Sequence, residues 1–429
     1  MATLAIAPQG ALSDYARRIE ESTILQIAGE IREHQKQGKE VLNLTVGDFR
    51  PDQFPIPKAM LNALIEALQK GETNYPPANG MPQLREAVVE TVRVDHGLEY
   101  PLESVLIGAG ARPLMFASFM ALVDQDEQVV FPVPSWNNHH YAILCNARPV
   151  AVTTTPENNF HLDRADLEPH LKTARLVSLN SPLNPTGTCI SRAALTGICE
   201  TIVQENHRRE RAGERPVFLL YDMVYHTLRF GQTEHVTPVG LVPEMVKWTI
   251  LVDSVSKNMC GTGLRVGWGL APPVIAKKMI EMAGHYGTWA PRAEQVATAK
   301  FLCDREAKEA HRATMIREVA ARLDLLHEGL SSMKKDGLPV EPIAPQGAIY
   351  LSARFDLIGR TVRGRAIKTN EDVRRLLLHE AGFAVVPFQA FGLPGETGWA
   401  RLSVGAVSLA EVKSGLARVR ALLEDARTA

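Results

Sequence analysis

Short apolar segments alternate with helical stretches through the middle of this 429-residue chain. Seven of them have the length of buried strands, at 105–107, 128–131, 149–153, 176–179, 217–221, 249–253 and 266–270. Most are separated by helical stretches, an alternation typical of a mostly parallel sheet that helices cover on both faces. The last segment follows its predecessor too closely for a crossover helix, so we expect it to be antiparallel. The sequence therefore predicts an α/β fold with a seven-stranded, mostly parallel sheet.

The two ends of the chain predict a second, smaller unit. Hydrophobic spacing and turn residues predict further elements at 13–37, 41–46, 304–334, 348–351, 370–380, 401–404 and 408–425. One hydrophobic core rarely serves so long a chain. We therefore expect an N-terminal arm and part of a small domain at 1–57, a large cofactor-binding domain at 58–305 and a small C-terminal domain at 306–429. The small domain is of α+β type and is built from both termini.

Charge and cysteine content argue against several classes of protein. With 47 basic and 48 acidic side chains, the chain has no general field to attract nucleic acid or an anionic membrane. Its five cysteines are odd in number and include no Cys-x-x-Cys pair, so they indicate neither a disulfide framework nor a zinc site. The apolar runs are too short for a signal peptide or a membrane span. We expect a cytoplasmic protein with no bound metal.

The segment from Ser254 to Gly267 places a lysine between a strand and a glycine-rich turn. Lys257 follows the hydroxyls of Ser254 and Ser256 and precedes Arg265 by eight residues. A lysine amine is nucleophilic only when it is deprotonated, and a buried, partly cationic site lowers its pKa enough to form an imine with an aldehyde. The hydroxyls and the arginine suit a phosphate dianion. This combination predicts a site for pyridoxal 5'-phosphate.

The same segment resembles the Ser-x-Ser-Lys-…-Gly-x-Arg-x-Gly signature of the class I aminotransferases, which are pyridoxal phosphate enzymes of fold type I. Further motifs follow in the order of that family: a phosphate loop at 108–112, a Pro-Trp segment at 134–139, an asparagine turn at 180–187 and an aspartate strand at 217–225. The resemblance spans nearly the whole chain from Leu12 onwards. It implies an enzyme that acts on an amino acid and a 2-oxo acid.

Around the cofactor ring, the resemblance assigns a task to each of several side chains. Asp222 ends an apolar strand, where a carboxylate keeps the pyridine nitrogen protonated and makes the ring an electron sink. Asn184 and Tyr225 hydrogen-bond to the 3-hydroxyl oxygen. Trp136 stacks on the ring, and His139 lies behind it and orients Asp222. Together with Lys257, Asp222 and Tyr225 form the expected catalytic set.

At the phosphate, the resemblance implies a site shared between two subunits. Gly110, Ala111 and Arg112 follow a strand and open a helix, whose backbone amides bind anions well. In the family, the tyrosine that matches Tyr75 reaches the phosphate of the neighbouring subunit. We therefore expect a homodimer.

For the substrate, two arginines are the main candidates. Arg401 matches the family's C-terminal arginine, whose planar guanidinium holds an α-carboxylate with two hydrogen bonds. The Gly47 backbone and Asn184 are expected close to that carboxylate. In one subgroup of the family, a cation at the position of Arg112 recognises a distal carboxylate, which favours aspartate or glutamate as one partner. Trp289 favours instead a narrower pocket or an aromatic substrate.

The leading prediction is an aminotransferase that moves an amino group between an L-amino acid and a 2-oxo acid through a Schiff base on Lys257. A β-lyase or a decarboxylase is an alternative, because the cofactor labilises several bonds on one scaffold. An aminotransferase of aromatic or aliphatic amino acids is a further alternative. A regulatory protein that binds the cofactor as a ligand needs an added DNA-binding module, and no basic helix-turn-helix stretch flanks the core.

Overall fold

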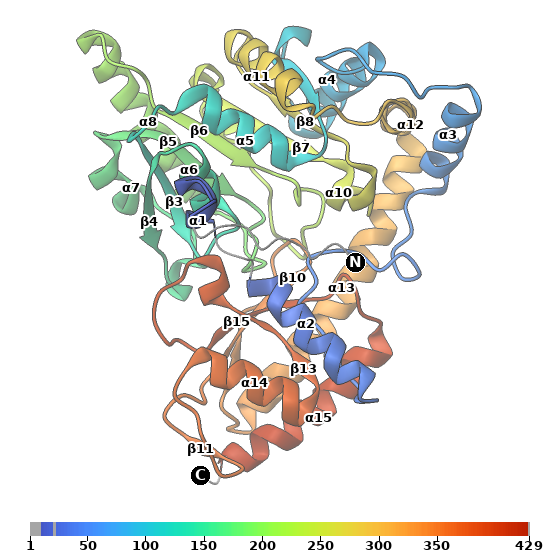
Figure 1. Cartoon of the computed structure of the whole chain (residues 1–429), viewed down its shortest axis with the longest axis vertical. Coiled ribbons are helices and arrows are strands. Elements are labelled where there is room, and N and C mark those ends of the chain that lie inside the picture. Colours follow the sequence, from blue (N-terminus) through green and yellow to red (C-terminus); the bar gives the residue numbers. More distant parts are fainter. Residues whose placement is uncertain (1–9, 20–22, 428–429) are drawn as a thin grey trace.

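A seven-stranded sheet forms the centre of the upper lobe in Figure 1. The computed structural model describes residues 10–19 and 23–427. In spatial order the strands are β2 (Val105–Gly108), β8 (Gly267–Leu270), β7 (Thr249–Ser254), β6 (Phe218–Asp222), β5 (Ala174–Asn180), β3 (Gln128–Val133) and β4 (Arg148–Thr153). β8 runs antiparallel to both of its neighbours, and the other pairings are parallel. The predicted seven-stranded sheet and its one antiparallel strand are confirmed.

Helices bury most of these strands on both faces, which explains why the strands are continuously apolar. The helices of this lobe are α3 (Lys58–Gln69), α4 (Pro82–His96), α5 (Ala111–Leu122), α6 (Asn138–Leu144), α7 (Arg164–Leu171), α8 (Arg192–Ala212), α9 (Pro238–Leu241), α10 (Val255–Asn258), α11 (Pro273–Tyr286) and α12 (Arg292–Cys303). Short 3-10 turns are η1 (Leu102–Ser104), η2 (Pro156–Asn158), η3 (Pro243–Lys247), η4 (Thr262–Leu264) and η5 (Phe388–Phe391). Within the described ranges, no helix has both the length and the apolar character needed to cross a bilayer.

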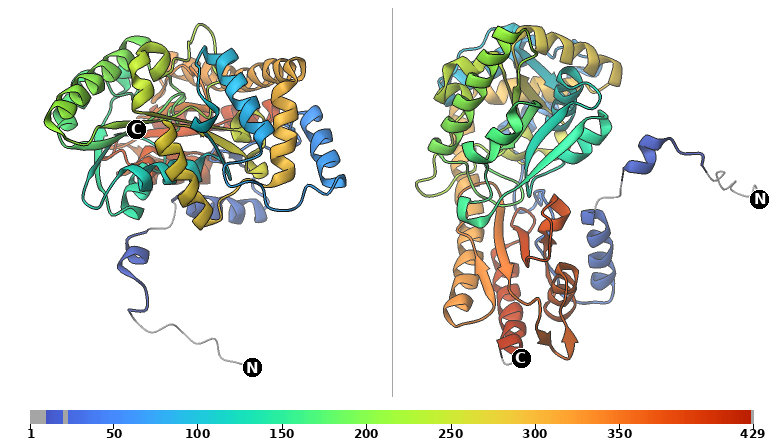
Figure 2. Two further views of the ribbon diagram at one scale, coloured as in Figure 1. Left: turned by 90° about the horizontal axis from the view of Figure 1, so that it is seen from above. Right: turned by 90° about the vertical axis from the view of Figure 1, so that its left-hand side faces the viewer.

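The lower lobe combines the C-terminal part of the chain with a segment from its beginning. Its four-stranded sheet has the order β14 (Val386–Pro387), β15 (Trp399–Ser403), β10 (Tyr350–Phe355) and β9 (Val340–Pro342). The other elements are β11 (Thr361–Val362), β12 (Arg365–Ala366), α14 (Asn370–Ala381), α15 (Leu409–Arg427) and α13 (Arg305–Lys335), and α13 runs down from the upper lobe (Figures 1 and 2). β1 (Leu42–Asn43) pairs in parallel with β13 (Phe383–Ala384), so both ends of the chain build this lobe, as expected.

The N-terminal helix differs from the single helix predicted over 13–37. α1 (Asp14–Arg18) ends at Ile19, whose backbone is extended, and α2 (Thr23–Lys36) begins further along. Ile27 and Ile31 are buried against the lower lobe, whereas Ile19 is 38% exposed. The apolar spacing therefore runs through residues that do not share one packing face. The strand predicted at 41–46 is also shorter, since only β1 has strand geometry.

The topology brings three polar side chains to one edge of the large sheet. In the strand register Asn180 pairs with Asp222, and Ser254 ends the next strand, β7. These are the carboxyl ends of parallel strands, where open α/β sheets bind their ligands. In this chain the edge faces the lower lobe (Figure 1).

Candidate active site

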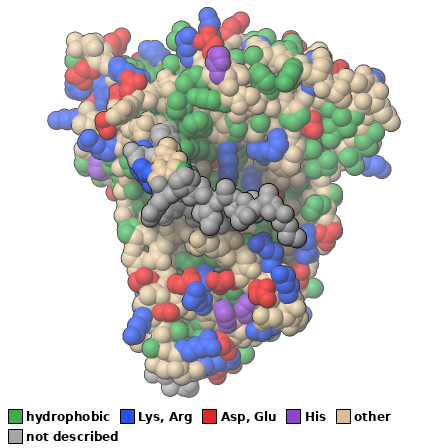
Figure 3. Space-filling view, in the orientation of Figure 1, with side chains coloured by type: hydrophobic (Ala, Val, Ile, Leu, Met, Phe, Trp, Pro, Cys, Tyr) green, Lys and Arg blue, Asp and Glu red, His purple; other side chains and the backbone are tan. Residues whose placement is uncertain are grey.

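A cavity of about 430 Å³ lies where the two lobes meet. Twelve of the residues predicted from the sequence line it: Gly47, Ala111, Arg112, Trp136, Asn184, Asp222, Tyr225, Ser254, Ser256, Lys257, Arg265 and Arg401. On the face shown in Figure 3, Lys and Arg side chains lie in the hollow between the lobes. The volume is typical of a site for a small organic molecule. Most of the side chains that line the cavity are polar or charged, so the molecule it suits is itself polar.

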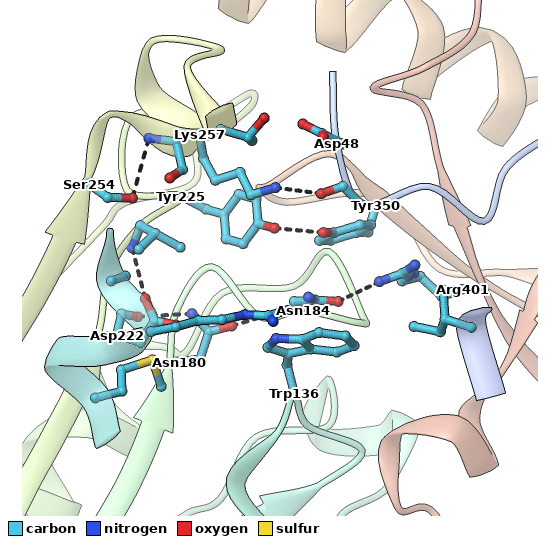
Figure 4. A pocket seen from close by; sticks show the side chains of 18 of the residues that line it. Asp48, Trp136, Asn180, Asn184, Asp222, Tyr225, Ser254, Lys257, Tyr350 and Arg401 are labelled. Atoms are coloured by element: carbon cyan, nitrogen blue, oxygen red, sulfur yellow. Dashed lines mark hydrogen bonds between the residues drawn. The ribbon is translucent and has the colours of Figure 1, made fainter. Parts of the chain in front are cut away.

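Lys257 projects from α10 into the centre of this cavity (Figure 4). Its Nζ donates a hydrogen bond to the backbone carbonyl of Gly47. Burial lowers the pKa of Lys257 to about 8, and the nearby guanidinium groups of Arg401 and Arg112 act in the same direction, against the carboxylates of Asp48 and Asp222. At pH 7 about a tenth of such an amine is neutral. Lys257 is therefore able to act as a nucleophile.

Asp222 lies at the end of β6 and is buried at the cavity wall. Burial raises the pKa of Asp222 to about 7, although the backbone N–H of Val224 donates to its carboxylate at 3.1 Å. A cation next to such a carboxyl would stabilise its ionised form. Asn180 links Asp222 to the asparagine turn, because its Nδ2 donates to the Asp222 carbonyl at 2.9 Å and its Oδ1 accepts from the Asn184 N–H at 2.8 Å.

A second tyrosine, which the sequence motifs did not reveal, completes one wall. Tyr350 on β10 forms a 2.6 Å hydrogen bond between its hydroxyl and that of Tyr225 (Figure 4). Burial raises the pKa of both tyrosines. The Arg401 guanidinium lies 4.8 Å from the centre of the Tyr350 ring. A hydroxyl in the otherwise apolar run 348–351 is the only sequence signal for Tyr350, and it does not say which lobe the tyrosine faces.

One end of the cavity is formed by Arg265 and the N-terminus of α5. A Cβ on Gly110, whose φ is +88°, would lie 2.5 Å from Arg265, and a Cβ on Gly267 would lie 2.5 Å from the Gly110 carbonyl carbon. Two glycines thus let the guanidinium approach the helix end. Arg265 donates to the carbonyls of Thr262 and Ala109 at 2.6 and 2.9 Å, and no described carboxylate pairs with it. An unpaired guanidinium beside a helix N-terminus is suited to an anion. Gly110 itself supports this end without lining the cavity.

The opposite end of the cavity holds a second unpaired guanidinium. Arg401 is 1% exposed and donates to Asn184 Oδ1 at 3.0 Å and to the Thr45 carbonyl at 2.6 Å. Its Nε has no partner, and no carboxylate of the described chain acts on it. A Cβ on Gly47 would lie 3.0 Å from the Tyr350 hydroxyl, so the glycine keeps this end open. A buried arginine without an acid is costly unless a ligand supplies the charge.

Of the remaining predicted residues, Arg112 lies at the cavity wall, whereas His139, Tyr75 and Trp289 lie outside the cavity. Arg112 is exposed at the cavity wall, with its guanidinium 5.2 Å from the centre of the Trp136 ring. His139 does not line the cavity. Its ring packs against that of His140, with the two ring centres 3.8 Å apart. Tyr75 is 81% exposed, and the centre of its ring lies 5.3 Å from the ring centre of Trp289. Neither ring reaches the cavity of its own chain.

Comparison with known proteins places this geometry in a family. A model of the class I and II aminotransferases matches residues 39–419. A probable aspartate/prephenate aminotransferase of Rhizobium leguminosarum bv. phaseoli is 31% identical over 387 residues, which are 89% of this chain and 92% of that protein. The crystal structure of the aspartate aminotransferase from Rhizobium meliloti has a TM-score of 0.87 at 28% identity and covers 98% of this chain and 100% of that one. The aromatic aminotransferase from Pyrococcus horikoshii OT3 has a TM-score of 0.79 at 27% identity, covering 92% and 98%. This chain therefore belongs to the class I and II aminotransferases and is a pyridoxal phosphate-dependent transaminase of fold type I.

Proposed function

We propose that this enzyme transfers an amino group between an acidic L-amino acid, aspartate or glutamate, and a 2-oxo acid, with Lys257 as its catalytic amine. The observation that carries this proposal is the position of the buried, partly neutral Lys257 between two unpaired arginines, Arg265 and Arg401. Such a cavity suits a phosphate at one end and a carboxylate at the other. The similarity to proteins named aspartate aminotransferase supports the acidic substrate.

The residues present fit pyridoxal 5'-phosphate. Arg265, the hydroxyls of Ser254 and Ser256 and the amides that open α5 would hold the phosphate. Asp222 would keep the proton on the ring nitrogen, and its pKa near 7 would fall beside that cation. When bound, the cofactor supplies an aldehyde for the amino group and a ring that accepts electrons from the substrate's Cα.

Three side chains around the ring complete the fit. Trp136 lines the cavity on the side from which it would face the ring. Tyr225 and Asn184 would bind the 3-hydroxyl oxygen. Their positions are held within the chain, because Tyr225 is fixed by Tyr350 and Asn184 by Asn180 and Arg401.

In this proposal Lys257 both binds the aldehyde and moves protons. Once the substrate's amine took its place, the freed Lys257 amine would accept the proton from the substrate's Cα and later give it back. A general base works best when its pKa lies near the operating pH, and the pKa of Lys257 at about 8 meets this condition.

Arg401 and Asn184 favour transamination over the loss of carbon dioxide. A guanidinium that holds the α-carboxylate with two N–H groups fixes which bond at Cα stands perpendicular to the ring. With the carboxylate held at Arg401, the substrate would present its Cα–H bond to the Lys257 amine, which lines the same cavity and would take that proton. The decarboxylase alternative requires the bond to the carboxylate in that position. A β-lyase also breaks the Cα–H bond first, and it differs by the loss of a group from Cβ and the release of ammonia.

Product analysis of the half-reaction tests this function. The holoenzyme is mixed with single L-amino acids, and the visible absorbance of the cofactor is followed. We expect absorbance to fall with release of one equivalent of 2-oxo acid, fastest with aspartate or glutamate. The Lys257→Ala variant serves as the control. Release of ammonia or carbon dioxide in place of the simple oxo acid would overturn the proposal.

Arg112 is the proposed selector of the acidic side chain. Its exposed guanidinium lines the cavity and makes no described ion pair. A guanidinium facing a carboxylate in a closed site contributes about 2 kcal/mol or more. Arg112→Ala should therefore slow dicarboxylic substrates at least tenfold, by the conversion of about 1.4 kcal/mol per decade, while sparing monocarboxylic ones. Equal losses for both classes would assign Arg112 to the phosphate or to the fold, and aromatic or aliphatic donors would then be preferred.

We also propose that two copies form a homodimer with shared sites. Leu61, Ile65 and Leu68 are exposed on one face of α3, and Tyr75 lies on the loop that follows. Exposed apolar side chains grouped in this way mark an interaction surface. A second copy would supply the Tyr75 that the cavity of one chain lacks. A monomeric mass by light scattering, with full cofactor retained, would exclude the shared site.

The domain division and the location also remain proposals. Separate hydrophobic cores in the two lobes support domains at 1–57 with 306–429 and at 58–305, with α13 crossing between them. The five cysteines are all free, which fits a reducing compartment such as the cytoplasm. Balanced charge continues to argue against nucleic acid as a partner.

A further inference from the structure

Three histidines that are distant in the sequence meet behind the catalytic cavity. His96 ends α4, His226 follows β6, and His235 precedes α9. Their candidate ligand nitrogens all lie within 4.8 Å of one another. None of the three lines the catalytic cavity, so the cluster is separate from the site already described.

The spacing of the three rings matches that of a metal centre. Their centres are 4.8, 5.6 and 5.7 Å apart. With zinc–nitrogen bonds of about 2.0–2.1 Å, an imidazole centre lies about 3.2 Å from the metal, and two rings at the tetrahedral angle lie about 5.2 Å apart. The three ring centres are therefore spaced much as three imidazoles around one metal ion would be.

The surroundings of His226 are those of a metal-bound histidine. Its Nε2 lies 3.2 Å from Asp253 Oδ2, a distance at which an N–H on Nε2 would face the carboxylate and Nδ1 would be left for a metal. Asp253 is itself held by the Ser254 N–H at 2.7 Å and by Asn258 Nδ2 at 2.8 Å. Metal-ligating histidines usually donate their other N–H to a carboxylate in this manner.

His235 has the buried polar atoms that such a site would explain. Both of its ring nitrogens are buried without a hydrogen bond. A backbone group of Ser181 lies close to the ring, but the geometry falls short of a hydrogen bond. A buried imidazole without hydrogen bonds destabilises the fold, and coordination to a metal would remove that cost.

The charge state of the cluster also permits coordination. Burial lowers the pKa of His96 and of His235, which favours the neutral form of both rings. Neutral imidazole is the form that binds metal. The nearby Arg229 opposes a dication, and the Asp253 carboxylate offsets it. His96 is only partly buried, which leaves a route for entry.

We propose that His96, His226 and His235 bind one zinc ion, with Asp253 as the hydrogen-bonding partner of His226. Three imidazoles are a ligand set typical of zinc, and water takes the fourth tetrahedral position. The ion joins the end of α4 to the segment after β6, which follows Asp222 and carries Tyr225. It is a structural site, and it does not depend on the reaction proposed above.

Zinc binding by the tag-free holoenzyme tests this proposal. After treatment with a chelator, the protein is dialysed against zinc and its metal content is measured. We expect one zinc per chain in the wild type and at least tenfold weaker binding in His96→Gln and, separately, in His235→Gln. His285→Gln is the matched control, because His285 also lies in the last turn of a helix but outside the cluster.

Two further measurements make the outcome decisive. X-ray absorption should show zinc bound by imidazole nitrogen, and zinc should raise the thermal midpoint of the wild type but not that of the two variants. Circular dichroism and the cofactor spectrum report whether each variant is folded. A wild type that takes up no zinc would overturn the proposal. So would a folded His96→Gln and a folded His235→Gln that both bind zinc as tightly as the His285→Gln control.

Discussion

Replacement of Arg401 by lysine separates the shape of the carboxylate site from its charge. Lysine keeps the positive charge but loses the planar fork that can hold a carboxylate with two N–H groups. The guanidinium is 1% exposed, and its Nε has no partner in the chain. Truncating one partner of a buried, hydrogen-bonded charge pair costs about 2–5 kcal/mol. Because lysine retains part of the attraction, we expect about 2–3 kcal/mol, which is about a 30- to 160-fold loss in kcat/KM.

The assay compares two substrates that differ only in the α-carboxylate. Single-turnover half-reactions are measured with an L-amino acid and with the amine that lacks its carboxylate. Arg401→Lys should slow the first and leave the second nearly unchanged. Arg374→Lys is a control, because Arg374 is equally buried but pairs with Glu30 and Glu371 away from the cavity. A loss of less than about tenfold (1.4 kcal/mol), or equal losses with both substrates, would refute the carboxylate contact.

Three further predictions concern Tyr350, Lys257 and Tyr75. Tyr350→Phe removes the hydrogen bond to Tyr225 and should slow the half-reaction by about 2- to 13-fold, the equivalent of about 0.5–1.5 kcal/mol. The same variant should shift the pH titration of the cofactor's absorbance, and an unchanged titration would contradict this role of Tyr350. Protonated Lys257 is not a nucleophile, so below its pKa of about 8 the apoenzyme should capture the cofactor about tenfold more slowly for each unit by which the pH falls. Stopped-flow mixing measures this rate, and a rate that does not change with pH in that range would contradict the prediction. Tyr75→Phe should weaken cofactor binding measured by dialysis without altering the dimer seen by light scattering, whereas unchanged affinity argues against the shared phosphate site.

Local sequence signals predicted the large lobe well because its strands are short, apolar and separated by helices. All seven strands were identified, and the lysine, aspartate and asparagine motifs lie at adjacent strand ends. Hydrophobic spacing was less informative at the N-terminus, where Ile19 and Ile27 belong to different packing environments. There the burial that defines a helix face comes from a distant part of the chain.

The site residues that the sequence did not reveal depend on contacts across the fold. Tyr350 meets Tyr225 from the other lobe, 125 residues away in the chain. The histidine cluster joins a helix end to two loops, so no metal-ligand spacing appears in the sequence. The role of His139 stays a prediction: its position three residues after Trp136 suggested a place behind the ring, and in the structure its ring packs on His140.

The most direct test of the account is the identity of the lysine that holds the cofactor. The holoenzyme is reduced with borohydride and digested, and the labelled peptide is mapped by mass spectrometry. We predict a single label on Lys257, and we predict that Lys257→Ala still binds the cofactor through Arg265 but carries no label and has almost no turnover. A label on any other lysine, or a Lys257→Ala variant with normal turnover, would contradict the account.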